Sequence, residues 1–368
     1  MPTAMQMRFF LLLLPALSID CLSFPQLDEE NARVCPYPWP EDIAPCVCQT
    51  NEKFQVFLTC DMWEDVTDRN GKDPISKLYQ AFQCNNEIFS FDINLNGHAW
   101  KIDISKENVG KFKMSYFSLS NYASIDGYVK PGTFSLSQES LMGVKIQKIN
   151  DKKDHYYRDS GIKTGAFSDL DALTSITIEG FKTINQEAFS NLPNLKELTL
   201  SGLAGSIPKR AFYNMKNLKE ITFEKSTIRW SIKTNAFEDL PSLEHLDLSN
   251  CGIRSIEPDA FSNLPRLNSL DLSNNQYLEY IGNSLATASA NMYVNLTKTR
   301  VTTISENSFK VFFENILENN GEGRIEMERL RCSCDMKWLL VSKLDVSSIL
   351  GNMKCSDGKY INEVSKQF

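Results

Sequence analysis

The sequence predicts an α/β solenoid, a stack of short repeats that each contribute one β-strand. Three observations support this prediction. A phrase of the form Leu-x-x-Leu-x-Leu recurs five times over residues 173–272. The repeats are 22 to 25 residues long, and most contain an Ala-Phe pair at a fixed place. Because a unit of this size cannot bury its own apolar face, the units must stack on one another.

The regular phrases start at Leu173, Leu195, Leu218, Leu243 and Leu267. Apolar residues two apart lie on one face of a strand, so each phrase predicts one strand of the sheet. Less regular phrases, starting at residues 88, 114, 141, 291 and 325, extend the prediction to roughly ten strands. We also expect a helix over residues 73–83 and two loops, over residues 150–158 and 314–323.

This pattern resembles extracellular leucine-rich-repeat proteins. The resemblance implies a horseshoe with a parallel sheet on the concave face and disulfide-bonded N- and C-terminal caps. The expected segments are a signal peptide over 1–23, an N-terminal cysteine cap with a helix over 24–87, repeats over 88–313 (regular from 173), and a C-terminal cysteine cap over 314–368.

Composition narrows the class of function. The 368 residues are 42% hydrophobic and 23% charged, which is typical of a folded protein. The net charge of -7 argues against a nucleic-acid partner, because such proteins normally carry a basic face. The sequence contains no long basic run, so binding to an anionic membrane surface is not expected. After the N-terminus, no segment reaches the ~18 apolar residues of a membrane helix, so no membrane span is predicted.

The N-terminus has the features of a secretory signal peptide. Arg8 precedes the apolar run of residues 9–14, and Pro15 and small residues follow. The run is too short for a membrane span. Cleavage after Ser18 and cleavage after Ser23 both remain open. A buried N-terminal helix is the alternative interpretation.

Four cysteines lie close together after this segment: Cys35, Cys46, Cys48 and Cys60. Export through an oxidising compartment favours disulfides, and three connectivities are possible. Zinc is a poorer alternative, because Cys-x-Cys is an unfavourable spacing for it in a secreted chain. The resemblance to N-terminal caps of secreted leucine-rich-repeat proteins implies the pairs Cys35–Cys48 and Cys46–Cys60.

The C-terminal cysteines resemble the second cap of the same families. Cys332, Cys334 and Cys355 are present, whereas that cap normally has four cysteines. We expect disulfide bonding of Cys332 and Cys355 and leave the partners of Cys334 and Cys84 open. Either the chain continues beyond Phe368 to a further cysteine, which we favour, or the missing partner comes from elsewhere.

Two sets of inward-facing residues are predicted to be structural. Cys251 falls at the ninth position of its repeat, where Asn275 and Thr299 stand in later repeats. In leucine-rich repeats, which this sequence resembles, that position holds Asn, Cys or Thr turned inward at a bend, where buried polar groups need partners. The resemblance therefore implies that Cys251 is buried, unpaired and inert. The recurring aromatic residues are expected to form core rather than a binding stripe: Phe134, Phe167, Phe189, Phe212, Phe237, Phe261 and Phe309, with Leu285 in one register.

The residues that alternate with the strand leucines must face outward on the concave sheet. One column reads Ser175, Glu197, Glu220, His245, Ser269, Tyr293. The next reads Thr177, Thr199, Thr222, Asp247, Asp271, Asn295, and the third Glu179, Ser201, Glu224, Ser249, Ser273, Thr297. The surface is polar and acid-leaning, with few aromatic or arginine anchors. It is therefore either a solvated sheet face or a site for a partner with a basic patch. The candidate binding residues are Glu197, Glu220, Glu224, His245, Asp247, Asp271 and Tyr293.

One glycosylation sequon, Asn295-Leu296-Thr297, lies on the same face. A sugar on Asn295 would obstruct the last part of the concave surface. Partners would then bind the earlier repeats, the insertion over 150–158 or the convex side.

Catalytic, cofactor and metal motifs are missing from the sequence. The three histidines, His98, His155 and His245, belong to separate repeats. His245, Asp247 and Ser249 share one strand face, but side chains two apart on a strand point in parallel and do not converge as a triad requires. We therefore expect a protein that is not an enzyme and has no cofactor.

Two segments carry a closer resemblance: residues 40–48 and the end, Cys355-Ser-Asp-Gly-Lys-Tyr-Ile. They are similar to arthropod secreted proteins related to the non-catalytic, leucine-rich-repeat subunit of the Oplophorus luciferase (Oplophorus-luciferin 2-monooxygenase). An oxygenase name in this group implies kinship rather than activity. The resemblance implies a secreted, extracellular protein that binds a protein partner and stabilises or presents it. A matrix or cell-surface adhesion and pattern-recognition protein is the alternative. The partner's identity and the oligomeric state stay open.

Overall fold

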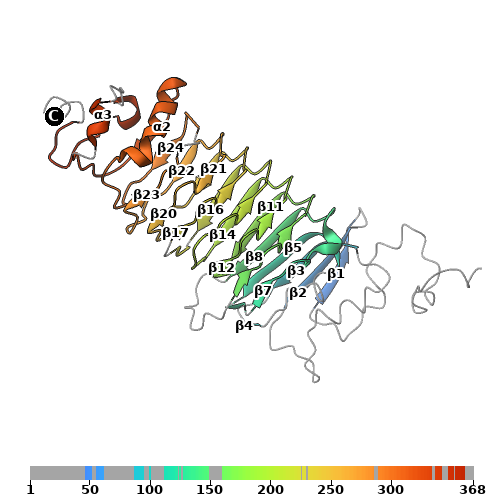
Figure 1. Ribbon diagram of the computed structural model, residues 1–368. Helices are drawn as coiled ribbons and strands as arrows, with labels where there is room; N and C mark the ends of the chain where they lie inside the picture. The colour runs from blue at the N-terminus through green and yellow to red at the C-terminus, as the bar shows by residue number, and fades with distance from the viewer. Residues whose placement is uncertain are drawn as a thin grey trace, which may run out of the picture.

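The structure is a computed structural model that describes residues 46–51, 55–61, 87–94, 99–100, 112–122, 124–125, 127–148, 160–224, 226–228, 231–285, 289–333, 336–341, 347–351 and 353–360. Within these residues the chain is a leucine-rich-repeat solenoid, which confirms the predicted fold class. Figure 1 shows the turns stacked along one axis, with the largest sheet running the length of the stack.

The largest sheet has twelve strands in the described residues and forms the concave face. Its strands, in order, are β1 (Cys46–Thr50), β2 (Val56–Asp61), β3 (Glu87–Asn94), β5 (Lys113–Tyr122), β8 (Gly143–Lys148), β11 (Ser175–Glu179), β14 (Glu197–Ser201), β16 (Glu220–Glu224), β19 (His245–Asp247), β22 (Ser269–Asp271), β24 (Tyr293–Asn295) and β25 (Arg324–Glu326). The ten predicted phrases supply β3 to β25. The additional two, β1 and β2, form an antiparallel hairpin that joins the sheet through a parallel β2–β3 pair.

Shorter parallel sheets complete each turn. Phenylalanine opens every strand of a five-stranded sheet on the convex side: β10 (Phe167–Ser168), β13 (Phe189–Ser190), β15 (Phe212–Tyr213), β18 (Phe237–Glu238) and β21 (Phe261–Ser262). Two three-stranded sheets consist of β7 (Gly127–Val129), β9 (Ser160–Ile162) and β12 (Thr183–Ile184), and of β17 (Ser231–Ile232), β20 (Ser255–Ile256) and β23 (Tyr280–Ile281). A two-stranded sheet pairs β4 (Ala99–Trp100) with β6 (Ser124–Ile125).

The core is a continuous column of phenylalanine rings, as predicted. The rings are stacked or tilted with centroids 5.7 Å apart for Phe134–Phe167, 5.3 Å for Phe167–Phe189, 5.6 Å for Phe189–Phe212, 5.1 Å for Phe212–Phe237 and 5.7 Å for Phe237–Phe261. All of them are at most 3% exposed. Strand leucines on one side and these rings on the other therefore fill each turn.

The predicted loop over residues 314–323 is wrong in its first half. Helix α2 spans Glu306–Glu318 and lies between β24 and β25 along the chain, while the two strands pair directly in the sheet. Its buried residues are Ser308, Phe309, Phe312, Phe313 and Ile316. Their spacing of three and four residues is that of a helix. The polar residues of 314–323, on which the loop prediction rested, are the helix's outer face and its end.

The C-terminal cap packs against this helix. It contains the short helices α3 (Lys337–Val341) and α4 (Ser347–Leu350). Trp338 lies 6.0 Å from the ring of Phe313, and its indole Nε1 donates to the carbonyl of Ile304 at 3.0 Å. Cys332 and Cys355 form a disulfide.

In the N-terminal cap, Cys48 and Cys60 are both disulfide-bonded, and Cys60 lies opposite Cys46 in the β1–β2 register. The pairings proposed for this cap remain predictions. Several expectations fall outside the described residues: the signal peptide (1–23), the helix (73–83), the insertion (150–158) and the residues Cys35, Cys84, Cys334, His98 and His155.

The ninth repeat position faces inward, as predicted for Asn275 and Cys251, both of which are 0% exposed. The Asn275 amide donates to the carbonyls of Leu248 and Leu272 at 2.9 and 2.8 Å. Its Oδ1 accepts from the N–H groups of Cys251 and Ile253 at 3.1 and 3.0 Å. Thr299 is only half-buried, although its hydroxyl also donates to a backbone carbonyl. This position satisfies backbone groups at the bend.

Cys251 is a free, buried cysteine, and burial raises the pKa of its thiol to about 12. Since the thiolate is the reactive form, we expect no alkylation of Cys251 by iodoacetamide at pH 8 in the native protein. After unfolding in urea the same residue should react fully, as measured by peptide mass spectrometry. Native alkylation would contradict its burial. Because its pKa is higher folded than unfolded, this thiol should also lower stability as pH rises above about 9.

Candidate binding surface on the concave sheet

The strand register aligns the candidate residues in columns across neighbouring strands. In the first column Ser175, Glu197, Glu220, His245, Ser269 and Tyr293 are successive partners. The second column joins Thr177, Thr199, Thr222, Asp247, Asp271 and Asn295 in the same way. Backbone pairing places the members of a column about 4.8 Å apart. These two columns therefore form a regular grid of polar side chains. In the third column Glu224 is exposed, but Ser201 and Ser273 are buried, so the expectation that this column faces outward is wrong for these two serines, which lie at or just after the ends of their strands.

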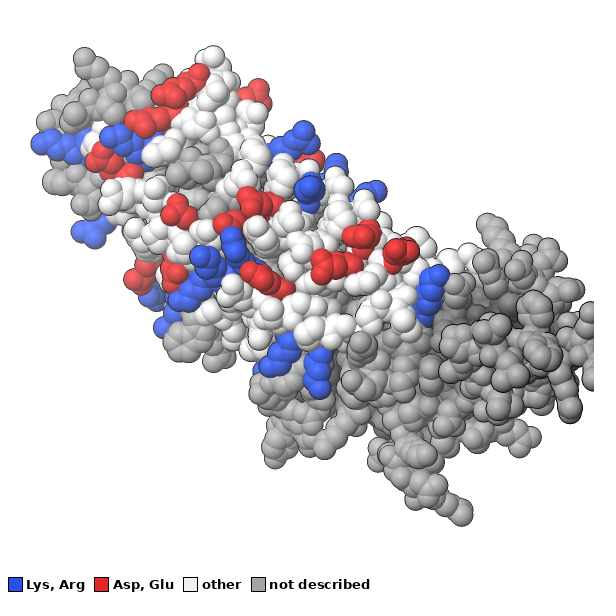
Figure 2. Space-filling view, turned by 45° about the vertical axis from the view of Figure 1, so that its right-hand side comes forward, with Lys and Arg blue, Asp and Glu red and all other residues white. Residues whose placement is uncertain are grey.

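Three carboxylates on this face are exposed and unneutralised. Glu197, Glu220 and Glu224 all point to solvent, and none forms an ion pair with a described residue. Glu197 and Glu220 are direct partners on adjacent strands. Like charges in that position repel each other. Figure 2 shows groups of acidic side chains along the middle of one face of the molecule, with basic groups between and around them.

The two aspartates of the second column are bound to their own backbone. Oδ1 of Asp247 accepts from the N–H of Ser249, and Oδ1 of Asp271 from the N–H of Ser273, each at 2.8 Å. Each carboxylate thus closes the turn that ends its strand. One oxygen of each is committed to a backbone N–H, so these two candidates are weaker ligands than Glu197 and Glu224. Oε1 of Glu220 also accepts a hydrogen bond, from the exposed Thr222 hydroxyl at 3.2 Å. His245 is exposed beside Glu220 in the first column.

The C-terminal end of the surface is tied up by internal contacts. The Tyr293 hydroxyl donates to Glu326, and the guanidinium of Arg324 lies 4.7 Å from the Tyr293 ring centroid. Burial, with a contribution from the Glu326 hydrogen bond, raises the pKa of Tyr293 to about 12. Asn295 donates to Asp271 at 3.3 Å and accepts from the Thr297 hydroxyl at 2.9 Å. A sugar on Asn295 would displace the first of these contacts; its presence stays a prediction.

The N-terminal end of the surface carries aromatic residues that the sequence reasoning missed. Phe89 contacts Phe57 and Tyr116 edge-on, with ring centroids 5.3 and 5.4 Å apart. Tyr116 is 39% exposed. It pairs with Gly143, which in turn pairs with Ser175, so Tyr116 extends the first column toward the N-terminus. The sequence does contain a signal for these aromatic residues. Aligning the outward positions of the irregular phrases from residue 88 onward with the later columns would have placed them on the same face.

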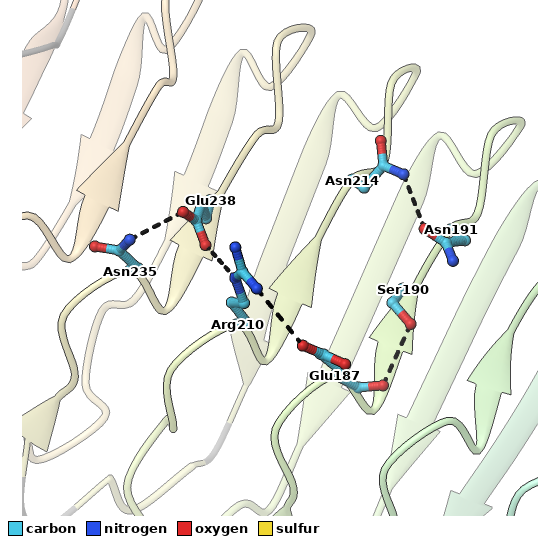
Figure 3. A network of polar contacts seen from close by, with 7 residues as sticks. All are labelled: Glu187, Ser190, Asn191, Arg210, Asn214, Asn235 and Glu238. Atoms are coloured by element: carbon cyan, nitrogen blue, oxygen red, sulfur yellow. Dashed lines mark hydrogen bonds and ion pairs between the residues drawn. The ribbon is translucent and has the colours of Figure 1, made fainter.

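The convex side carries a polar network that spans several repeats (Figure 3). Arg210 donates to Glu238 at 2.7 Å and lies 4.0 Å from a carboxylate oxygen of Glu187. The hydrogen bond with Glu238 raises the pKa of Arg210. Asn214 donates to Asn191 at 2.8 Å. These contacts join neighbouring repeats along the stack.

Asn214 has a left-handed backbone, with φ of 54°, as does Asn191 at the same repeat position. Asparagine and glycine tolerate this region, whereas a β-branched side chain does not. We expect Asn214→Val to lower the free energy of unfolding by roughly 1–2 kcal/mol relative to Asn214→Gly. Urea titration of the two variants measures the difference, and equal stabilities would contradict it.

A hollow of about 350 Å³ opens on the convex side near the N-terminal repeats. Its lining is mostly small or polar and includes Ser135, Gln138, Thr164, Ser168, Asp169 and Glu187. Among the described residues, no group of three or more His, Cys, Asp or Glu side chains is placed to hold a metal ion. Within the same residues, no helix has the length and apolar character needed to cross a membrane.

A comparison with known protein families agrees with the repeat fold. A family model described as "BspA type Leucine rich repeat region (6 copies)" matches residues 138–229 and 182–316. A search of curated proteins finds no match.

Among solved structures, a TLR13–ssRNA13 complex is 14% identical, with a TM-score of 0.35, over 79% of this chain and 56% of that one. The Drosophila Toll–Spatzle complex is 14% identical, with a TM-score of 0.32, over 75% and 47%. A leucine rich cell surface protein of Faecalibacterium prausnitzii is 13% identical, with a TM-score of 0.24, over 80% and 95%. The chain thus spans about half the length of the first two chains.

Proposed function

We propose that this leucine-rich-repeat solenoid is a secreted, non-catalytic binding protein whose concave sheet recognises a basic surface of a protein partner. The observation behind this proposal is the pair Glu197 and Glu220, aligned on adjacent strands without a neutralising partner among the described residues. A cation from a partner would relieve their repulsion. Glu224 extends the acidic area along β16.

Three features favour secretion. The N-terminal residues have the pattern of a signal peptide. Cys48, Cys60, Cys332 and Cys355 are disulfide-bonded, which is typical of oxidising compartments. The sequon at Asn295 is consistent with the same route. Detection of the mature chain in culture medium, with an N-terminus after Ser18 or Ser23, tests this part.

The similarity of residues 40–48 and of the segment that starts at Cys355 to the Oplophorus subunit group refines the proposal. It favours a small soluble protein as the partner, which the solenoid stabilises. A pull-down from native secretions that repeatedly recovers one small protein would support this refinement. Recovery only with membranes or matrix would favour the adhesion alternative.

The acidic surface is tested with a basic probe. Fluorescence anisotropy measures binding of labelled oligolysine to the wild type and to Glu197→Gln/Glu220→Gln. We expect the double variant to bind several-fold, up to about tenfold, more weakly, because each exposed ion pair contributes about 0.2–1 kcal/mol. The matched control is Glu318→Gln/Glu322→Gln, which removes the same charge from two glutamates near the end of α2. An equal loss in the control would contradict recognition by the concave sheet.

A further inference from the structure

One flank of the solenoid carries an aromatic and arginine cluster of a different character. Tyr277 lies between two guanidinium groups, those of Arg254 at 5.3 Å and Arg300 at 5.7 Å from its ring centroid. The two arginines come from the repeats before and after the one that carries Tyr277. Three successive repeats therefore bring one ring and two positive charges together.

The cluster is open to solvent. Tyr277 is 52% exposed, and Tyr280, three residues further along at the start of β23, is 50% exposed. Arg254 immediately precedes β20, the neighbour of β23. Figure 1 shows β17, β20 and β23 along one edge of the stack, so the cluster belongs to a flank of the solenoid. Tyrosine and arginine are among the side chains that most often anchor protein interfaces.

The positive charge of the cluster is only half neutralised. Arg300 donates to a carboxylate oxygen of Glu279 at 3.0 Å. Arg254 contacts the Tyr277 ring and forms no ion pair with a described residue. The cluster therefore has two guanidinium groups and one paired carboxylate, that of Glu279, although the overall charge of the chain is -7. A further carboxylate placed beside Arg254 would complete the charge balance.

We propose that this flank, defined as Arg254, Tyr277, Tyr280 and Arg300, is a second interaction surface that binds an acidic, partly apolar peptide segment of a protein partner. A carboxylate of the segment pairs with Arg254, and an adjacent apolar side chain covers the exposed faces of Tyr277 and Tyr280. The surface is separate from the acidic concave sheet and complementary to it in charge, so the two surfaces select different ligands.

The local chemistry favours such a peptide over a polyanion. A sulfated polysaccharide needs several neighbouring cations, whereas this flank has two arginines and also Glu279, which repels it. The two tyrosine rings offer apolar area that a polysulfate cannot use. A carboxylate next to an aromatic or aliphatic residue matches both features.

The test uses the full chain and a labelled peptide with two glutamates around one phenylalanine, at low ionic strength. Saturable binding is expected, and Arg254→Gln/Arg300→Gln should weaken it several-fold, up to about tenfold, since two charged contacts are lost. Arg254→Lys keeps the charge without the planar guanidinium and should cause a smaller loss. A peptide with glutamine in place of glutamate should not bind.

Lys216→Gln/Arg266→Gln is the matched control, because it removes two exposed cations that form no ion pair with described residues. It should leave the affinity unchanged. The concave-sheet variant Glu197→Gln/Glu220→Gln should bind the acidic peptide with unchanged affinity, so the two surfaces are tested separately. No saturable binding to the wild type would overturn the proposal. An equal loss in the control, or tighter binding of heparin through the same arginines, would overturn it as well.

Discussion

Replacing Phe212 by alanine is expected to lower the free energy of unfolding by about 3–5 kcal/mol. Its ring is 0% exposed and stacks between Phe189 and Phe237, 5.6 and 5.1 Å away. Phe223 contacts it edge-on at 5.8 Å. Alanine would remove the contacts of two neighbouring repeats at once and leave a cavity in the middle of the stack, where neither side can collapse onto it.

Urea unfolding followed by circular dichroism measures this loss. The control is Val311→Ala on the outer face of α2, where the side chain is 44% exposed. That change should stay within about 0.5 kcal/mol. A loss below about 1 kcal/mol for Phe212→Ala would mean that the phenylalanine column does not carry the repeat interfaces.

The second large effect is expected at Asn275. Its amide makes five hydrogen bonds to backbone groups, and Asn275→Ala would leave two N–H groups and three carbonyls without those partners. A buried polar group without a partner costs about 1–3 kcal/mol. We therefore expect a loss of roughly 3 kcal/mol or more, although the side chain removed is small and polar.

The same urea titration applies, with Asn268→Ala as the control. Asn268 is exposed, and that change should be nearly neutral. Asn275→Ala with wild-type stability would show that water or a local rearrangement satisfies the bend, and the inward position would then have no structural role.

The repeat register can be predicted from the sequence because the alternation of apolar and polar residues in each strand indicates which side chains face the core. Apolar residues in the Leu-x-x-Leu-x-Leu phrase must face inward, so the outward columns follow by counting. Counting alone predicts that Glu197 and Glu220 lie side by side, and the strand pairing confirms it. Counting with the strand pattern fails in α2. The buried Phe309, Phe313 and Ile316 there are spaced three and four residues apart, which is a helical spacing that a strand pattern does not detect.

The properties of the site depend more on side-chain partners, which counting cannot supply. Asp247 and Asp271 stand in the same outward column as Thr222, yet each is bonded to its own backbone. The flank around Tyr277 is assembled from three repeats by residues outside any strand phrase. Only the stacking of the repeats brings Arg254 and Arg300 to one ring.

The concave sheet is the surface through which we propose that this solenoid binds its partner. Photocrosslinking tests this assignment directly, with oligolysine that carries a benzophenone and mass spectrometry of the crosslinked peptides. We predict crosslinks within β14 and β16, which contain Glu197, Glu220 and Glu224. Crosslinks concentrated in the convex strands β13 and β15, with none in β14 or β16, would contradict the assignment.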